Sequence, residues 1–111
     1  ADILRDIERQ RRFANPGFSF SLTAQEIGLS NSSFTRAFQK YTGKLPMDSL
    51  VELRTNYAKE LLAETDQSVV EIAEAVGYYS VSSFSKRFKS TTGLTPKEYR
   101  QRFGKNAADN G

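Results

Sequence analysis

An internal repeat spans most of this chain and restricts the folds that it can adopt. The segment SSFTRAFQKYTGKLP at 32–46 recurs fifty residues later as SSFSKRFKSTTGLTP at 82–96. Upstream the match continues at a shift of forty-nine, pairing Ser19, Ala24 and Gly28 with Ser68, Ala73 and Gly77. The second copy therefore has one extra residue after its glycine. Two copies of one supersecondary unit account for most of the 111 residues.

Each copy has the pattern of two helices joined by a tight turn. Ser19 and Ser68 stand where a helix begins, and Ser68 with Glu71 has the form of a capping box. The first helix ends at Gly28 or Gly77, because glycine accepts the left-handed backbone of a sharp turn. A second helix is expected over 31–42 and over 80–92. This order of helix, turn and helix predicts a helix-turn-helix unit, in which a small Ala24 or Ala73 lets the helices pack closely.

A long helix is expected between the two units, over about 46–65. It opens at Pro46 and keeps a helical apolar period at Met47, Leu50, Leu53, Tyr57, Leu61 and Leu62. Residues 1–14 predict an amphipathic helix with Ile3, Leu4, Ile7 and Phe13 inward, and Pro96 opens a last short helix. The predicted fold is all-α, with about seven helices forming two tandem, homeodomain-like helix-turn-helix units on a long central helix. One domain over 1–111 would hold unit one at about 3–45, the connecting helix at about 46–65, unit two at about 68–103 and a tail at 104–111.

The residue types that are absent exclude several classes of function. The chain has no cysteine and no histidine, which removes the usual zinc ligands, the usual general base and both familiar hydrolase triads. No enzyme activity, metal or other cofactor is expected. No apolar run reaches the ~18 residues of a membrane span, so a cytoplasmic protein without membrane contact is expected.

The charge is distributed unevenly along the chain. Residues 30–45 carry three basic residues and no acid, and residues 82–105 carry seven basic residues against Glu98 alone. Residues 46–76 hold two basic residues against seven acids. Two basic segments therefore flank an acidic one, and each basic segment contains one of the repeated second helices.

The polar faces of these two helices carry no acid. In 31–42, Phe34, Phe38 and Tyr41 form an apolar stripe toward the core, opposite Ser32, Thr35, Arg36, Gln39 and Lys40. In the second copy Phe84 and Phe88 form the stripe, opposite Ser82, Ser85, Lys86 and Lys89. A solvated face usually mixes both signs of charge, whereas hydroxyl, amide and cationic groups without carboxylates suit a polyanion. The faces therefore favour contact with double-stranded DNA.

The side chains divide into base readers and phosphate contacts. Arg36 suits guanine because arginine can donate two hydrogen bonds to its major-groove edge, and Lys86 holds the matching place. Ser32, Thr35, Ser82 and Ser85 are short enough to let the helices approach the bases. Contacts with the DNA backbone, which position the protein without reading sequence, are assigned to Gln39, Lys40, Arg87, Lys89 and Lys97.

Other interpretations of these features are open. The repeat also fits a helical array built for protein contacts, although such arrays usually need ~3 copies. Arg36 could form a flanking salt bridge, and Val81 could touch a thymine methyl or help to close the longer second turn. Arg9, Arg11 and Arg12 could contact phosphates or belong to a solvated face.

The connecting helix predicts how the units would lie on DNA. About eighteen residues of helix span ~27 Å. Successive major grooves on one side of a duplex lie ~34 Å apart, so a monomer with this connector could read two adjacent turns. Its site would be asymmetric or a direct repeat.

These segments resemble the DNA-binding domain of the AraC/XylS family of bacterial transcription activators over roughly residues 3–103. The most specific match is SVVEIAEAVGYYSVSSFSKRFKSTTGLTPKEYR at 68–100. The connector also matches the family's arginine-x-x-x-alanine-x-x-leucine-leucine pattern at Arg54, Ala58, Leu61 and Leu62. The resemblance implies seven helices, with helix-turn-helix segments at Ser19 to Thr42 and Ser68 to Thr92.

By this resemblance, the chain would bind promoter DNA sequence-specifically and regulate transcription, with helices 31–42 and 80–92 in successive major grooves. Ser32, Thr35 and Arg36 would meet bases in the first unit, and Val81, Ser82, Ser85 and Lys86 in the second. Lysine at 86 departs from the frequent arginine, so the second helix would add more affinity than specificity. Contact with RNA polymerase is also implied. Most members of the family carry an effector-binding or dimerisation domain before this one, which would be missing from this fragment, whereas a minority consist of the DNA-binding unit alone. Operator, effector, activation or repression, and the oligomeric state of the parent protein stay open.

Overall fold

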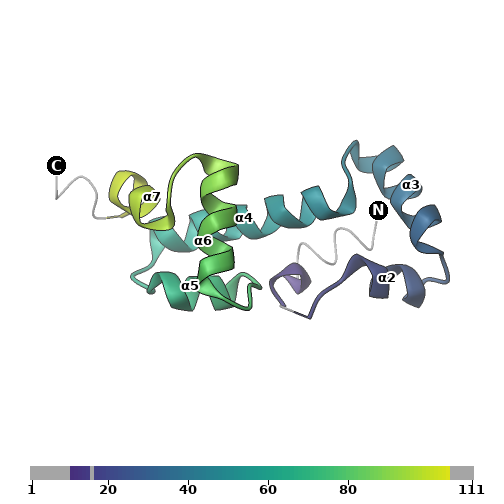
Figure 1. Ribbon diagram of the computed structural model, residues 1–111, viewed down its shortest axis with the longest axis horizontal. Coiled ribbons are helices and arrows are strands. Elements are labelled where there is room, and N and C mark those ends of the chain that lie inside the picture. The colour runs from purple at the N-terminus through teal and green to yellow at the C-terminus, as the bar shows by residue number, and fades with distance from the viewer. Residues whose placement is uncertain (1–10, 16, 106–111) are drawn as a thin grey trace.

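The computed structural model describes residues 11–15 and 17–105, which form six α-helices and one short 3-10 helix. Two short helices are followed by a long central helix, three further helices cover its other half, and the molecule is elongated at 52 × 24 × 23 Å (Figure 1). In chain order the elements are η1 (Arg12–Ala14), α2 (Phe20–Glu26), α3 (Asn31–Thr42), α4 (Pro46–Glu64), α5 (Val69–Ala75), α6 (Val81–Thr92) and α7 (Pro96–Phe103). The all-α prediction of two helix-turn-helix units on a long central helix is confirmed. No helix in the described ranges is long and apolar enough to cross a membrane.

The predicted caps and turns form as the sequence chemistry requires. The Ser19 side chain accepts a hydrogen bond from the Ser21 amide at the start of α2, and Ser68 and Glu71 complete a capping box at the start of α5. Gly28 and Gly77 take left-handed φ values of 78° and 105°. These two glycines reverse the chain so that α3 lies across α2, and α6 across α5.

The apolar side chains gather in two separate clusters. Cluster one lies between η1, α2, α3 and the first half of α4, and consists of Phe13, Phe20, Ala24, Phe34, Phe38 and Leu50. Cluster two lies between the second half of α4, α5 and α6, and consists of Ala58, Leu62, Ile72, Ala73, Val76, Phe84 and Phe88. Ala24 and Ala73 are essentially inaccessible, which confirms the predicted close approach of the helices.

Two predicted core positions are wrong. Tyr41 was expected to continue the stripe of Phe34 and Phe38, but it is 78% exposed. On α3, the ring of Phe20 from the seven-residue α2 contacts those of Phe34 and Phe38, and the last turn of α3 extends beyond the cluster. Met47 was expected to face the core and is 64% exposed, because cluster one meets α4 first at Leu50.

The helix expected over 1–14 lies largely outside the described residues, which include neither Ile3, Leu4 and Ile7 nor the predicted tail from 106 onward. Its last residues differ from the prediction. Arg11 has a left-handed φ of 54° and is followed by the 3-10 helix η1, so no α-helix continues through this point. Phe13 is nevertheless buried, as expected.

Candidate nucleic-acid interface

The polar face of α3 is held outward by its cap and its core contacts. Ser30 accepts a hydrogen bond from the Ser33 amide and thereby fixes the start of the helix. The rings of Phe34 and Phe38 lie 5.8 and 5.2 Å from that of Phe20, which anchors the apolar face. At 100° per residue, the exposed Ser32, Arg36 and Gln39 lie within about 60° of one another on the opposite face, and the exposed Lys40 adjoins Arg36.

Helix α6 has the same arrangement, and the phenylalanines of its apolar face are more deeply buried than those of α3. Ser80 caps it through the Ser83 amide, and Phe84 and Phe88 are each 1% exposed. Ser82, Lys86 and Lys89 are exposed opposite them. Val81 begins the helix and is 37% exposed, so part of its side chain is accessible beside Ser82.

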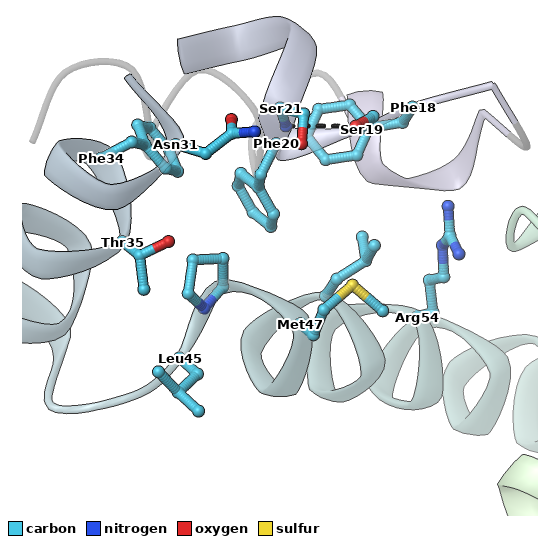
Figure 2. Close-up of a pocket in the computed structure, with 12 residues that line it drawn as sticks. Phe18, Ser19, Phe20, Ser21, Asn31, Phe34, Thr35, Leu45, Met47 and Arg54 are labelled. Atoms are coloured by element: carbon cyan, nitrogen blue, oxygen red, sulfur yellow. Dashed lines mark hydrogen bonds between the residues drawn. The ribbon is translucent and has the colours of Figure 1, made fainter. Parts of the chain in front are cut away.

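Two of the predicted base readers lie at the border of the faces. Thr35 and Ser85 are partly buried, at matching places in α3 and α6. Thr35 also lines an open cleft of about 520 Å³ between α2, α3 and the start of α4. Figure 2 shows its hydroxyl directed into that cleft. Ser32 and Arg36 are therefore better placed to protrude from α3 than Thr35 is.

The predicted phosphate contacts do not all share one face. Arg87 lies about 100° further round α6 than Lys86, and it lines a second cleft with Asp48 and Glu52 of α4. Lys97 is exposed in the first turn of α7. The structure thus groups Lys89 with Ser82 and Lys86, and separates Arg87 from them.

Ion pairs distinguish the basic residues further. Within residues 11–15 and 17–105, Arg36 forms no salt bridge, whereas Lys44 in the same basic segment pairs with Glu52. Arg11 pairs with Glu60 at 3.4 Å and stacks over the ring of Tyr57 at 4.2 Å. Arg11 is therefore engaged within the protein, and Arg36 is not.

Three residues have structural positions that the sequence analysis did not anticipate. Tyr79, next to the helix cap Ser80 at the site of the one-residue insertion, is 84% exposed. Arg100 donates from Nε to the Leu62 carbonyl and from a terminal nitrogen to Thr65, each at 3.1 Å, and so caps the end of α4. Arg54 is half-buried and donates from Nε to the Phe13 carbonyl at 2.8 Å. Burial lowers the pKa of Arg54, and the nearby Tyr78 and Tyr79 partly offset this shift.

The chain matches a known domain family and the sequences of known transcription regulators. Residues 23–102 match the family described as a helix-turn-helix domain. The chain is 37% identical over 95 residues to the RCS-specific HTH-type transcriptional activator RclR of Escherichia coli, and 39% identical over 74 residues to the MmsAB operon regulatory protein of Pseudomonas aeruginosa. These matches cover 84% and 67% of this chain, but only 34% and 24% of the relatives. The matched regions thus span about a third and about a quarter of the length of these regulators.

Solved structures share the whole arrangement. The C-terminal domain of the response regulator AraT from Geobacillus stearothermophilus superposes with a TM-score of 0.85 at 28% identity, covering 94% of this chain and 88% of that one. The DNA-binding domain of AdpA, a global transcriptional factor solved in complex with a target DNA, superposes with a TM-score of 0.86 at 25% identity. This second match covers 98% of this chain and 94% of that one.

Proposed function

Because this chain belongs to the AraC-type helix-turn-helix family of DNA-binding transcription regulators, which are not enzymes, we propose that α3 and α6 are its two recognition helices. The family binds DNA sequence-specifically, and each of these helices would enter one of two successive major grooves on one side of the duplex. The observation that carries this proposal is the pair of exposed, acid-free faces on α3 and α6, joined by a single helix. The 19 residues of α4 span about 28 Å, which suits grooves ~34 Å apart.

Unit one would read sequence chiefly through Arg36 and Ser32. Arg36 is exposed and unpaired in the described part of the chain, so it can offer both donors to a guanine. Thr35 lies at the border of the same face and would meet an adjacent base. Gln39 and Lys40, further along α3, would contact the backbone.

Unit two would contribute more affinity than discrimination. Val81, Ser82, Ser85 and Lys86 would meet bases, and lysine there supplies a point charge rather than the two-pronged donor of arginine. Lys89 and Lys97 would contact phosphates, as would Arg87 on the flank that faces α4. The exposed Tyr79 adjoins the start of α6, where recognition helices approach the bases, and we add it to this surface.

The place of this domain in a longer regulator is also a proposal. The DNA-binding domain would consist of unit one at about 3–45, a connector at about 46–65 and unit two at about 68–103. The relatives are about three to four times as long as the matched region, which supports a further effector-binding or dimerisation domain. The complete protein would act in the cytoplasm, bind promoter DNA and contact RNA polymerase.

The test is selection of bound duplexes from a random pool, followed by titration of the selected site at several salt concentrations. If Lys40, Arg87, Lys89 and Lys97 each neutralise one phosphate, log K against log salt has a slope of about −3.6. Two base-specific blocks about one helical turn apart are expected in the selected site. A protein that binds no duplex at low salt, or whose binding ignores salt, would instead be a helical protein-interaction module.

A further inference from the structure

The relative orientation of the two units is not set by a shared hydrophobic core. Among residues 11–15 and 17–105, the two clusters have no buried residue in common, and only the partly buried Tyr57, near the middle of α4, packs against both. In Figure 1, α2 and α3 lie at one end of α4, whereas α5, α6 and α7 gather around the other. In the part of the chain that the structure describes, the units are therefore held together by α4 and by the contacts at its middle.

Arg54 makes such contacts from α4 to unit one. Its Nε donates to the Phe13 carbonyl at 2.8 Å, and a terminal nitrogen donates to the Asn15 carbonyl at 3.3 Å. Phe13 lies within the short η1 segment and Asn15 directly follows it, and both are more than thirty-five residues from Arg54 in sequence. Two bonds from one planar guanidinium set the orientation of this segment as well as its distance from α4.

Arg54 also reaches the turn of unit two. Its guanidinium carbon lies 5.5 Å from the centre of the Tyr78 ring, and Tyr78 packs against cluster two. The backbone of Gly77 lies against the same junction, since a Cβ there would stand 2.9 Å from Arg54 Nε and 3.0 Å from the Phe13 and Ala14 carbonyl oxygens. One side chain thus touches η1 of unit one and the α5–α6 turn that leads into the second recognition helix.

Small rotations between the two units at the middle of α4 would displace the recognition helices relative to the DNA. A rotation of about 10° between the units, half of what counts as a sharp helix kink, would displace one recognition helix by roughly 6 Å across a ~34 Å separation. This displacement exceeds the rise of one base pair, ~3.4 Å. Because long helices bend, α4 alone would not fix the angle between the units to within a few degrees. A second contact between the units is therefore needed.

We propose that Arg54 is a positioning residue that locks unit one to the turn of unit two, and thereby selects the spacing between the two half-sites. The proposal rests on the proposed function, since it presupposes that both units bind one duplex. Arg54 itself need not touch DNA. Its loss should leave each unit able to bind its own half-site while relaxing the spacing that the pair accepts.

The test uses the selected site, derivatives with one base pair inserted or deleted between the halves, and derivatives with either half scrambled. Arg54→Met removes the donors at similar length, Arg54→Lys keeps the charge without the fork, and Lys59→Met removes one charge from α4 outside the junction. Both Arg54 variants should lower the preference for native over altered spacing by roughly three- to thirtyfold. Lys59→Met should leave that preference unchanged.

The outcomes separate the two proposals. If the wild-type protein binds no duplex, the proposed function fails. If it binds with a strict spacing and the Arg54 variants keep that strictness, the positioning role of Arg54 is wrong. Equal losses on the full site and on each half-site would likewise overturn it, because they indicate general destabilisation.

A second measurement needs no DNA, so it can also be made on variants that bind DNA too weakly for the spacing assay. The chain has no cysteine, so Tyr41→Cys at the exposed end of α3 and Ser90→Cys on α6 can carry spin labels without competing thiols. The inter-label distance distribution should be narrow in the otherwise wild-type chain and should broaden in Arg54→Met. An unchanged distribution in a folded Arg54→Met protein would contradict the inference.

Discussion

A Cβ placed on Gly77 would stand 2.9 Å from the Nε atom of Arg54, which is closer than Cβ atoms approach non-bonded atoms in real proteins. The Phe13 and Ala14 carbonyl oxygens would lie at 3.0 Å from it. The corresponding Gly28 of unit one has a similar left-handed backbone, but apart from its chain neighbours no atom of the described residues lies within 4 Å of the place its Cβ would take. The two repeated glycines therefore differ in what surrounds them.

Substitution of these glycines by alanine should have unequal effects. Gly28→Ala should lower the free energy of unfolding by about 1–2 kcal/mol, the cost of a left-handed backbone alone. Gly77→Ala adds steric conflict with two backbone carbonyls and should cost about 3 kcal/mol or more. Urea denaturation of both variants measures the difference. Equal costs would show that the junction yields without strain.

The second cluster depends on its phenylalanines. Phe88 is 1% exposed, so Phe88→Ala should lower the free energy of unfolding by about 3–5 kcal/mol. Tyr41→Ala is the matched control, because this aromatic ring is 78% exposed, and it should change stability by less than about 0.5 kcal/mol. Thermal and chemical denaturation measure both. A large cost at Tyr41 would mean that its ring is covered in solution.

The two recognition helices should respond differently to loss of a cation. Arg36→Ala should cost about 1–3 kcal/mol on the selected site and relax the preference at one base position. Lys89→Ala should weaken binding to all duplexes about equally and make the salt slope shallower by about 1. Titration of matched and mismatched duplexes distinguishes these outcomes. An equal effect of Arg36→Ala on every sequence would remove its base-reading role.

The capping boxes make stability depend on pH. Hydrogen bonds from the Ser68 amide and hydroxyl hold the pKa of Glu71 below its ordinary 4.5, and those from Thr95 do the same for Glu98. A depressed folded-state pKa stabilises the fold above the unfolded pKa, and this contribution is lost as the pH falls below about 4.5 through the folded values. We therefore expect the urea midpoint to fall over that range.

Glutamine variants test this assignment. Glu71→Gln and Glu98→Gln together should flatten the dependence of the urea midpoint on pH between pH 6 and pH 3. Glu74→Gln, the matched change on α5 away from its amino end, should leave most of that dependence in place. If the double variant and Glu74→Gln behaved alike, the acid sensitivity would arise elsewhere in the chain.

Local features were predictable because their causes lie within a few residues of sequence. The serine caps, the turns at Gly28 and Gly77, and the extra residue before α6 all depend on short-range backbone chemistry. The fifty-residue repeat placed equivalent helices and put Arg36 and Lys86 on matching exposed faces. That much of the fold and of the proposed interface follows from the order of the residues.

The remaining features were decided by the tertiary structure. Helical periodicity places Tyr41 and Met47 on the apolar faces of their helices. Whether these side chains are buried depends on how far the neighbouring helices extend, and both are exposed. Arg87 carries the charge of a phosphate contact, and its place beside Asp48 and Glu52 is set by the packing of α6 against α4, which no local pattern indicates. Arg54 meets Phe13 across forty-one residues, and no local pattern encodes that distance. The sequence determined two repeated units, and the contacts at the middle of α4 decided how they are held relative to each other, because orientation depends on atoms that only the folded chain brings together.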